Sequence, residues 1–242
     1  MFENITKQSI SDTVFDQLTA KILDGDIDAG EALPSERQLC ELLGVNRGAV
    51  REALKRLQQA GLVEVRHGGA TTVLDYLDNG GLELLPQLMI TPEGKMRLEV
   101  ARSIVGMRQS MAPDIAKACA SKRKEKHLQQ LQSLLAQMQN TNNTDELQTL
   151  AFAYWRELVA GSGNIAFRLA FNSMQKAYDK IWSLLANVLE PELRDIANLE
   201  KLTQAIAEQN PEDAHHFATQ YLLNGTNAMN AVLNAYGQSE IK

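Results

Sequence analysis

The chain of 242 residues is poor in cysteine and histidine, and it has no long run of apolar residues. Its two cysteines, Cys40 and Cys119, lie in apolar helical patterns without the spacing of metal ligands, so we expect buried, reduced thiols. No segment approaches the roughly 18 apolar residues of a membrane helix, and residues 1–10 lack the apolar run of a signal peptide. These absences favour a cytoplasmic protein that does not bind a membrane.

Catalytic motifs are missing as well. The sequence has no Ser/Cys–His–Asp arrangement, no glycine-rich phosphate loop and no HExxH, and two of its 4 histidines, His215 and His216, are adjacent. Neighbours on a helix point about 100° apart, so this pair is more typical of surface or packing residues than of a metal site. Two classes of function remain: a ligand-responsive DNA-binding regulator, and an enzyme or small-molecule binder built on a helical bundle. The missing motifs disfavour the enzyme.

The charge balance is acidic, with a formal net charge of −6. Residues 1–75 contain 8 Lys or Arg and 12 Asp or Glu, so even this part would not coat nucleic acid non-specifically. Residues 47–66, however, hold five basic residues against Glu52 and Glu64. Any DNA affinity must therefore come from this local cluster, and it should be sensitive to salt.

The segment 33–74 reads as a helix, a tight turn, a second helix and a two-stranded wing. Ser35 can cap the first helix, and Leu39, Leu42 and Leu43 form one apolar stripe at helical spacing. Gly44 follows, where the end of a helix favours a residue that tolerates positive φ. Two helices joined by so short a turn are typical of a helix-turn-helix.

The second predicted helix, residues 47–60, has Asn46 as its cap and two distinct faces. One face is apolar and consists of Val50, Ala53, Leu54 and Leu57. The other face is basic at every fourth position, with Arg47, Arg51 and Lys55, and Arg56 lies beside them. Alternation at residues 62–65 predicts a strand, His67, Gly68 and Gly69 a turn, and residues 70–74 the returning strand.

This combination favours DNA as the partner. Arginines near the start of a recognition helix can reach guanine bases or phosphates in the major groove, and a small wing tip can approach the backbone or the minor groove. The alternative is that the basic face of this helix is only solvated and binds no partner. The coincidence of helix, turn, helix and wing in one segment makes it much the weaker one.

Outside this segment the patterns are helical. A helix capped by Ser11 and Asp12 should complete the core of the first domain, residues 1–75. Residues 76–81 read as a hinge, and six or seven helices follow in a second domain, residues 82–242. The expected helices of the second domain span residues 93–120, bent at Pro113, and 127–138, 147–159, 164–189, 190–210 and 212–235. The predicted fold class is therefore mostly α, with one small β wing.

The motifs LPSER, LGVNRGAVREAL and RHGGATTV closely resemble the winged helix-turn-helix of the GntR family of bacterial transcription regulators. ARSIVGMR, RELVAGSGN and AIAEQNPEDA are similar to the all-helical effector domain of its FadR branch. The resemblance implies a homodimer that reads a short palindromic operator in double-stranded DNA. The DNA-binding residues it implies are Arg37, Asn46, Arg47, Gly48, Ala49, Arg51, His67 and Gly68.

Most members of this family hold a metal ion in the bundle with one Asp and three His. The matching positions here are Ala151, Trp155, Leu199 and Tyr221, which lack suitable ligands. We therefore expect no metal and no other cofactor.

Loss of the metal is shared with the FadR proteins that bind fatty acyl-CoA, and GGLELLPQL, Arg108 and Tyr221 also look like theirs. Leu222, Gly225 and Met229 depart from their pattern. The resemblance implies a fatty acid or fatty acyl-CoA as effector, with a small organic acid as the alternative. The expected effector-binding residues are Arg102, Arg108, Trp155, Asn172, Tyr178, Tyr221, Asn224 and Met229. Plain core packing is the alternative reading of the aromatic residues among them.

Overall fold

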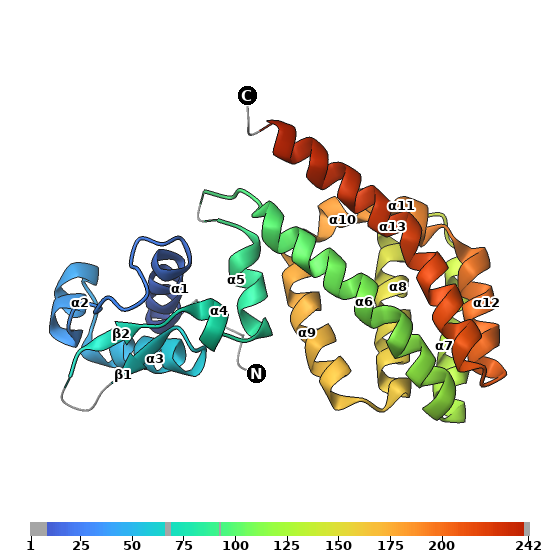
Figure 1. Ribbon diagram of the computed structural model, residues 1–242, viewed down its shortest axis with the longest axis horizontal. Coiled ribbons are helices and arrows are strands. Elements are labelled where there is room, and N and C mark those ends of the chain that lie inside the picture. The colour runs from blue at the N-terminus through green and yellow to red at the C-terminus, as the bar shows by residue number, and fades with distance from the viewer. Residues whose placement is uncertain (1–8, 66–68, 92, 240–242) are drawn as a thin grey trace, which may run out of the picture. The chain divides into compact units, whose positions relative to one another are not determined.

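The computed structural model describes residues 9–65, 69–91 and 93–239. The chain divides into two compact units, Met1–Lys95 and Met96–Lys242. The predicted fold class is confirmed: the first unit is a winged helix-turn-helix and the second is all-helical (Figure 1). The unit boundary differs from the prediction, because residues 76–81, expected to form the hinge, lie within the first unit.

The first unit follows the predicted order. It comprises α1 (Ile10–Leu23), α2 (Glu36–Leu43), α3 (Arg47–Gln59), β1 (Val63–Val65), β2 (Thr71–Val73), α4 (Tyr76–Asn79), η1 (Leu82–Leu84) and α5 (Leu85–Met89). The strands pair antiparallel, with Val63 opposite Val73. Residues 31–33 extend this sheet, since the amide of Leu33 donates to the Thr71 carbonyl at 2.8 Å.

Local capping sets the helix ends. The Ser35 side chain caps α2, Gly44 ends it with φ 65°, and the Asn46 side chain caps α3, as predicted. The start of α1 differs from the prediction. Ser9, and not Ser11, is its cap, because Ser9 and Asp12 form a reciprocal capping box.

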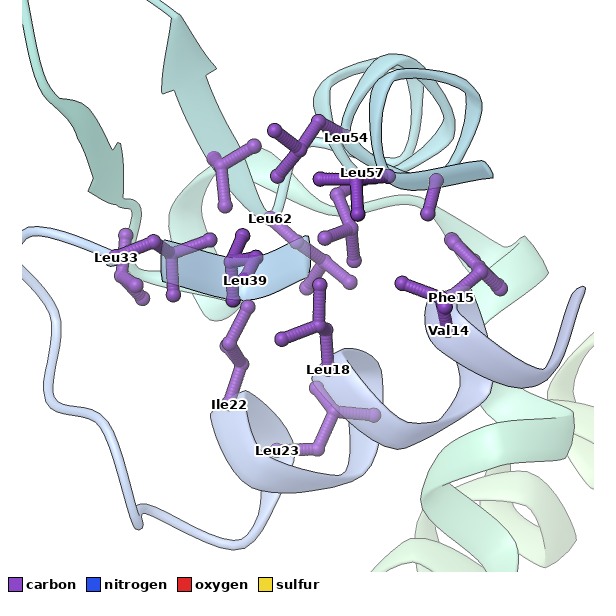
Figure 2. Packing of buried hydrophobic residues seen from close by; sticks show 14 of the residues in the cluster. Val14, Phe15, Leu18, Ile22, Leu23, Leu33, Leu39, Leu54, Leu57 and Leu62 are labelled. Atoms are coloured by element: carbon purple, nitrogen blue, oxygen red, sulfur yellow. The ribbon is translucent and has the colours of Figure 1, made fainter. Parts of the chain in front are cut away.

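One apolar core joins the three helices and the wing. Figure 2 shows Leu18 and Ile22 of α1 reaching toward Leu39 of α2, with Leu57 of α3 and the side chains around it closing the cluster. Leu42 is the exception to the predicted stripe, since it is 72% exposed. Leu39 and Leu43 face the core from one side of this two-turn helix, which leaves no buried position for Leu42.

The residues after the wing pack onto this core. Leu84 belongs to the buried cluster, and Leu88 lies against it. Gly61, with φ 71°, lies in close contact with α4. A Cβ at this position would lie 2.1 Å from the Asn79 carbonyl oxygen. The turn after α3 therefore depends on glycine both for its backbone conformation and for its space.

The second unit is a bundle of long and short helices. It comprises α6 (Leu98–Lys122), α7 (Glu125–Gln139), α8 (Thr144–Ser162), α9 (Ile165–Asp179), α10 (Trp182–Val188), α11 (Glu190–Leu193), α12 (Ile196–Ala207) and α13 (Pro211–Ser239). The two longest, α6 and α13, pack along each other (Figure 1). Gly161 lets α8 approach α6, because a Cβ there would lie 2.5 Å from the Cys119 sulfur.

Several predicted boundaries in this unit are wrong. The first helix starts at Leu98 and not near residue 93, because the amide of Thr91 donates to the Lys95 carbonyl and closes a turn. The helix predicted over 164–189 breaks after Asp179, and α10 begins at Trp182, whose carbonyl accepts from Gln148 of α8. The helix predicted over 190–210 breaks at Asp195, whose side chain caps α12.

Both cysteines are free thiols, but only Cys119 is fully buried, and burial raises the pKa of its thiol to about 12. Cys40 is only partly buried, which corrects the prediction for that residue.

Gly61→Ala should destabilise the first unit more than Gly44→Ala does. Both glycines have positive φ, so both substitutions bring backbone strain of about 1 kcal/mol. Gly44 has no atom within 4 Å of the added Cβ, whereas Gly61 meets Asn79, which adds roughly 1–3 kcal/mol. Hydrogen exchange of the α3 amides measures both losses, and equal losses would contradict the close contact.

Candidate DNA interface and effector cavity

The exposed face of α3 carries the basic residues that the sequence predicts. Arg47, Arg51 and Lys55 are exposed, while Val50 and Leu57 on the opposite face are fully buried. Arg47 has no ion-pair partner among the residues that the structure describes. Arg51 is already engaged, because its Nε donates to Glu36 Oε2 at 2.8 Å. The side chain of Arg51 is 64% exposed, so a phosphate can compete for it.

Arg56 has a different role from the other basic residues of α3. Its Nη1 donates to Asp12 Oδ1 at 2.5 Å, and its guanidinium lies 4.1 Å from the centre of the Phe15 ring. These two contacts with α1 are an ion pair and a cation–π interaction. Arg56 therefore fixes the recognition helix against α1 and is not free to contact DNA.

The other predicted DNA-binding residues lie in different settings. Arg37 is exposed on α2, 3.9 Å from Glu41. The Asn46 side chain accepts from the Ala49 amide at 3.0 Å, and a Cβ at Gly48 would approach that side chain at 3.2 Å. Ala49 is buried, so its methyl group faces the core, which corrects its assignment as a DNA contact. His67 and Gly68 lie outside the described residues.

The second unit contains a partly open cavity of about 60 Å³. Side chains from α6, α8, α9, α11 and α13 line it, and nearly all of them are apolar. The lining residues are Arg108, Met111, Ala112, Ile115, Ala151, Phe152, Trp155, Phe171, Met174, Tyr178, Leu189, Glu192, Leu193 and Leu222.

A buried ion pair forms the polar part of this lining. Arg108 Nη2 of α6 donates to Glu192 Oε1 of α11, and the two side chains are only 11% and 3% exposed. Burial raises the pKa of Glu192, although the guanidinium opposes that shift, and the carboxylate in turn holds Arg108 protonated. Among the described residues that line the cavity, these two are the one cation and the one anion.

Further polar atoms gather around the pair. Arg108 Nη1, Glu192 Oε2, Trp155 Nε1 and the hydroxyls of Tyr178 and Tyr221 are buried without a hydrogen-bond partner in the described structure. Both tyrosines interact electrostatically with Arg108 and Glu192. Burial raises the pKa of Tyr178 to about 12, so its hydroxyl keeps its proton and can donate. Buried polar groups in native proteins are nearly always paired, so this cluster is suited to a polar group of a ligand.

The predicted effector-binding residues divide into two groups. Arg108, Trp155 and Tyr178 line the cavity, and the ring of Tyr221 lies 6.3 Å from that of Trp155. Tyr221 is not among the lining residues, and neither are the remaining four, which corrects the prediction for these five. Arg102 hydrogen-bonds Asn234 and the Leu233 carbonyl, Asn224 hydrogen-bonds Asp195, Asn172 is exposed, and Met229 is buried elsewhere along α13.

Glu192 is the important residue that the sequence does not reveal. In the segment Glu190–Leu193 it resembles the exposed acidic residues common in the first turn of a helix. The contact that buries it comes from Arg108, far away in the sequence. Gly225 offers a faint signal, because a Cβ there would lie 2.0 Å from Glu192 Oε2. Gly225 thus makes room on α13 for the carboxylate.

The residues at the family's metal positions do not fit a metal ion. Ala151 and Trp155 line the cavity and Leu199 is buried, and none of these side chains can coordinate a metal. Tyr221 alone would be a poor site. Within the described part of the chain, no group of three or more His, Cys, Asp or Glu residues could hold a metal ion.

Comparison with known proteins agrees with this architecture. Residues 10–73 match the model of the bacterial regulatory proteins of the gntR family, and residues 103–224 match the FCD domain. The HTH-type transcriptional regulator Mce2R of Mycobacterium tuberculosis is 36% identical over 229 residues, which cover 95% of both chains. The chain belongs to the GntR family.

Other similarities to known proteins are weaker. The fatty acid metabolism regulator protein of Yersinia enterocolitica is 28% identical over 169 residues, covering 69% of this chain and 68% of that protein. Among solved structures, Lar of Listeria monocytogenes has a TM-score of 0.58 at 14% identity, covering 94% of this chain and 99% of Lar. A GntR-family regulator from Pseudomonas syringae has a TM-score of 0.50 at 18% identity, covering 96% of this chain and 89% of that one. These two structures support the fold alone.

This GntR-family protein is therefore a DNA-binding transcriptional regulator with an FCD effector domain, and not an enzyme. None of the described helices combines the length with the apolar character that a membrane span requires.

The Arg108–Glu192 pair should show strong coupling in a double-mutant cycle. Arg108→Met or Glu192→Gln alone leaves a buried polar group without its partner and should cost about 3–5 kcal/mol, while the double variant should lose much less than the sum. Urea unfolding followed by fluorescence reports on this unit, because both tryptophans, Trp155 and Trp182, lie in it.

The exposed pair of Arg194 and Glu190 provides a matched control, with Nε and Oε1 2.8 Å apart. Arg194→Met and Glu190→Gln should each cost less than about 1 kcal/mol. Additive losses at Arg108 and Glu192 would contradict a coupled buried pair.

Proposed function

We propose that this GntR-family regulator acts in the cytoplasm as a homodimer on a short palindromic operator, and that a fatty-acid-derived effector in the cavity controls its DNA binding. The observation that carries the proposal is the cavity itself, with apolar walls and one buried ion pair. Burial of apolar ligand area contributes about 25 cal/mol per Å², so an acyl chain supplies binding energy that a small hydrophilic acid lacks.

The polar groups suit the head of such a ligand. Arg108, Tyr178 and Trp155 each present a hydrogen-bond donor without a protein partner in the described structure, and all three line the cavity. A carbonyl or carboxyl oxygen would satisfy these donors and orient the acyl chain toward the apolar walls. The likeness to a fatty acid metabolism regulator points the same way.

The size of the cavity bears on the mechanism. A volume of 60 Å³ admits about four to six waters, so a longer acyl chain fits only if the lining rearranges. Met111 of α6 and Met174 of α9 are flexible side chains suited to this movement. Ligand binding would then shift the packing of α6 against α9. A change of this kind couples effector binding to DNA binding when the two packings differ in DNA affinity.

The same volume favours a second candidate, a small organic acid such as a sugar acid, dicarboxylate or hydroxycarboxylate. Such a ligand would fit without rearrangement and could approach Arg108. The apolar walls and the carboxylate of Glu192 disfavour it.

Titration of the protein–operator complex decides between the two effectors. Acyl-CoAs and free fatty acids of increasing chain length should change operator affinity more as the chain grows, by roughly 0.8 kcal/mol of binding energy per buried CH₂. Short dicarboxylates and hydroxycarboxylates should have no effect. A response to small hydrophilic acids alone would establish the alternative.

Arg47→Ala should weaken operator binding by about 1–3 kcal/mol if Arg47 contacts a base, because this exposed side chain heads the recognition helix. Arg51→Ala should also weaken binding, and each lost phosphate contact should reduce the salt dependence. Fluorescence anisotropy on operator DNA at several salt concentrations measures both.

Lys21→Ala is the control, since Lys21 lies on α1 and pairs with Asp26 at 3.2 Å. It should leave affinity nearly unchanged. Unaltered affinity in the Arg47→Ala/Arg51→Ala double variant would remove α3 as the recognition helix.

A further inference from the structure

The charge inside the cavity constrains which head group a ligand can carry. Arg108 would attract a carboxylate if it were alone, but Glu192 lies against it and neutralises it. No second cation lines the cavity among the residues that the structure describes. A free carboxylate entering this site would meet Glu192 in surroundings that screen charge poorly, and like charges brought together there repel strongly.

Most of the unpaired polar atoms around the ion pair are hydrogen-bond donors. Among the described residues that line the cavity, the buried atoms without a protein partner are donors on Arg108, Trp155 and Tyr178, against the acceptor Glu192 Oε2, and the unpaired hydroxyl of Tyr221 belongs to a ring beside that of Trp155. A group that accepts hydrogen bonds and carries no charge suits both conditions. The carbonyl oxygen of an ester, thioester or amide is such a group.

We infer that Glu192 is a specificity-determining residue that makes the cavity select an uncharged acyl group, such as an ester or thioester, over a free fatty acid. The inference rests on the proposed function, since it assumes an acyl ligand in this cavity. Its basis is the geometry: Glu192 is held beside Arg108 by α11, and Gly225 of α13 provides the space that its carboxylate occupies.

Two matched ligands test the inference, methyl octanoate and octanoate, which share one acyl chain and differ in head-group charge. Binding to the full-length protein is measured by isothermal titration calorimetry at pH 7.5. The wild type should bind the ester at least about tenfold more tightly than the acid. Glu192→Gln removes the negative charge and leaves Arg108 uncompensated, so the ester-to-acid affinity ratio should fall by at least about tenfold. The comparison of ratios cancels the greater hydrophobicity of the ester.

Two further variants sharpen the result. Glu190→Gln makes the same chemical change on the same short helix, but Glu190 is exposed and pairs with Arg194, so it should keep the wild-type ratio. Gly225→Ala adds a Cβ at the place of Glu192 Oε2 and should displace the carboxylate, lowering the ratio without changing the charge. This variant supplies the comparison if Glu192→Gln does not fold.

The outcomes separate this inference from the proposed function. If octanoate binds the wild type as tightly as methyl octanoate, or if neither Glu192→Gln nor Gly225→Ala changes the ratio, the role of Glu192 is overturned while an acyl effector stands. If neither ligand binds the wild type, the acyl effector itself fails and the inference fails with it.

Discussion

The buried pair of Arg108 and Glu192 is the constraint around which the second unit is arranged. Removing two charges from water is costly, and their mutual attraction offsets that cost only when the geometry is good. The long helix α6 supplies the cation, the short helix α11 supplies the anion, and α13 supplies Gly225 to make room. The apolar walls then leave the pair as the main source of electrostatic selectivity in the cavity.

The first unit is acidic overall, yet it presents a basic surface on α3. Acidic residues elsewhere in the unit occupy some of its cations: Asp12 holds Arg56 and Glu36 holds Arg51. Arg47 stays exposed at the start of the recognition helix. Because Arg56 and the core leucines fix α3 from behind, the orientation of its exposed face depends on packing that never touches DNA.

Local signals in the sequence predict the first unit well. The caps Ser35 and Asn46 and the glycine at 44 each act within one turn, so the helix-turn-helix could be predicted closely. Tertiary contacts override local patterns elsewhere, and there the structure differs from the prediction. α9 ends at Asp179 and α10 begins at Trp182 inside an apparently continuous helical pattern, and the burial of Glu192 depends on a distant arginine.

The predictions for the cavity residues also differ in their basis. The family resemblance led to Arg108 and Trp155, which line the cavity, and to Tyr221 beside Trp155, because whole helices are aligned by their motifs. The expectation for Asn172 and Asn224 rested on polarity, which does not tell which face of a helix points inward. Both are exposed.

Gly225 has a consequence for how this sequence can change over time. Any side chain at 225 would occupy the space of the Glu192 carboxylate, so the two positions are not independent. A lineage that gains a larger residue at 225 must first lose or move the acid at 192, and Arg108 would then face the cavity uncompensated. A substitution at this one buried helix position can thus change which metabolites the regulator senses. The residues that contact the operator need not change at all.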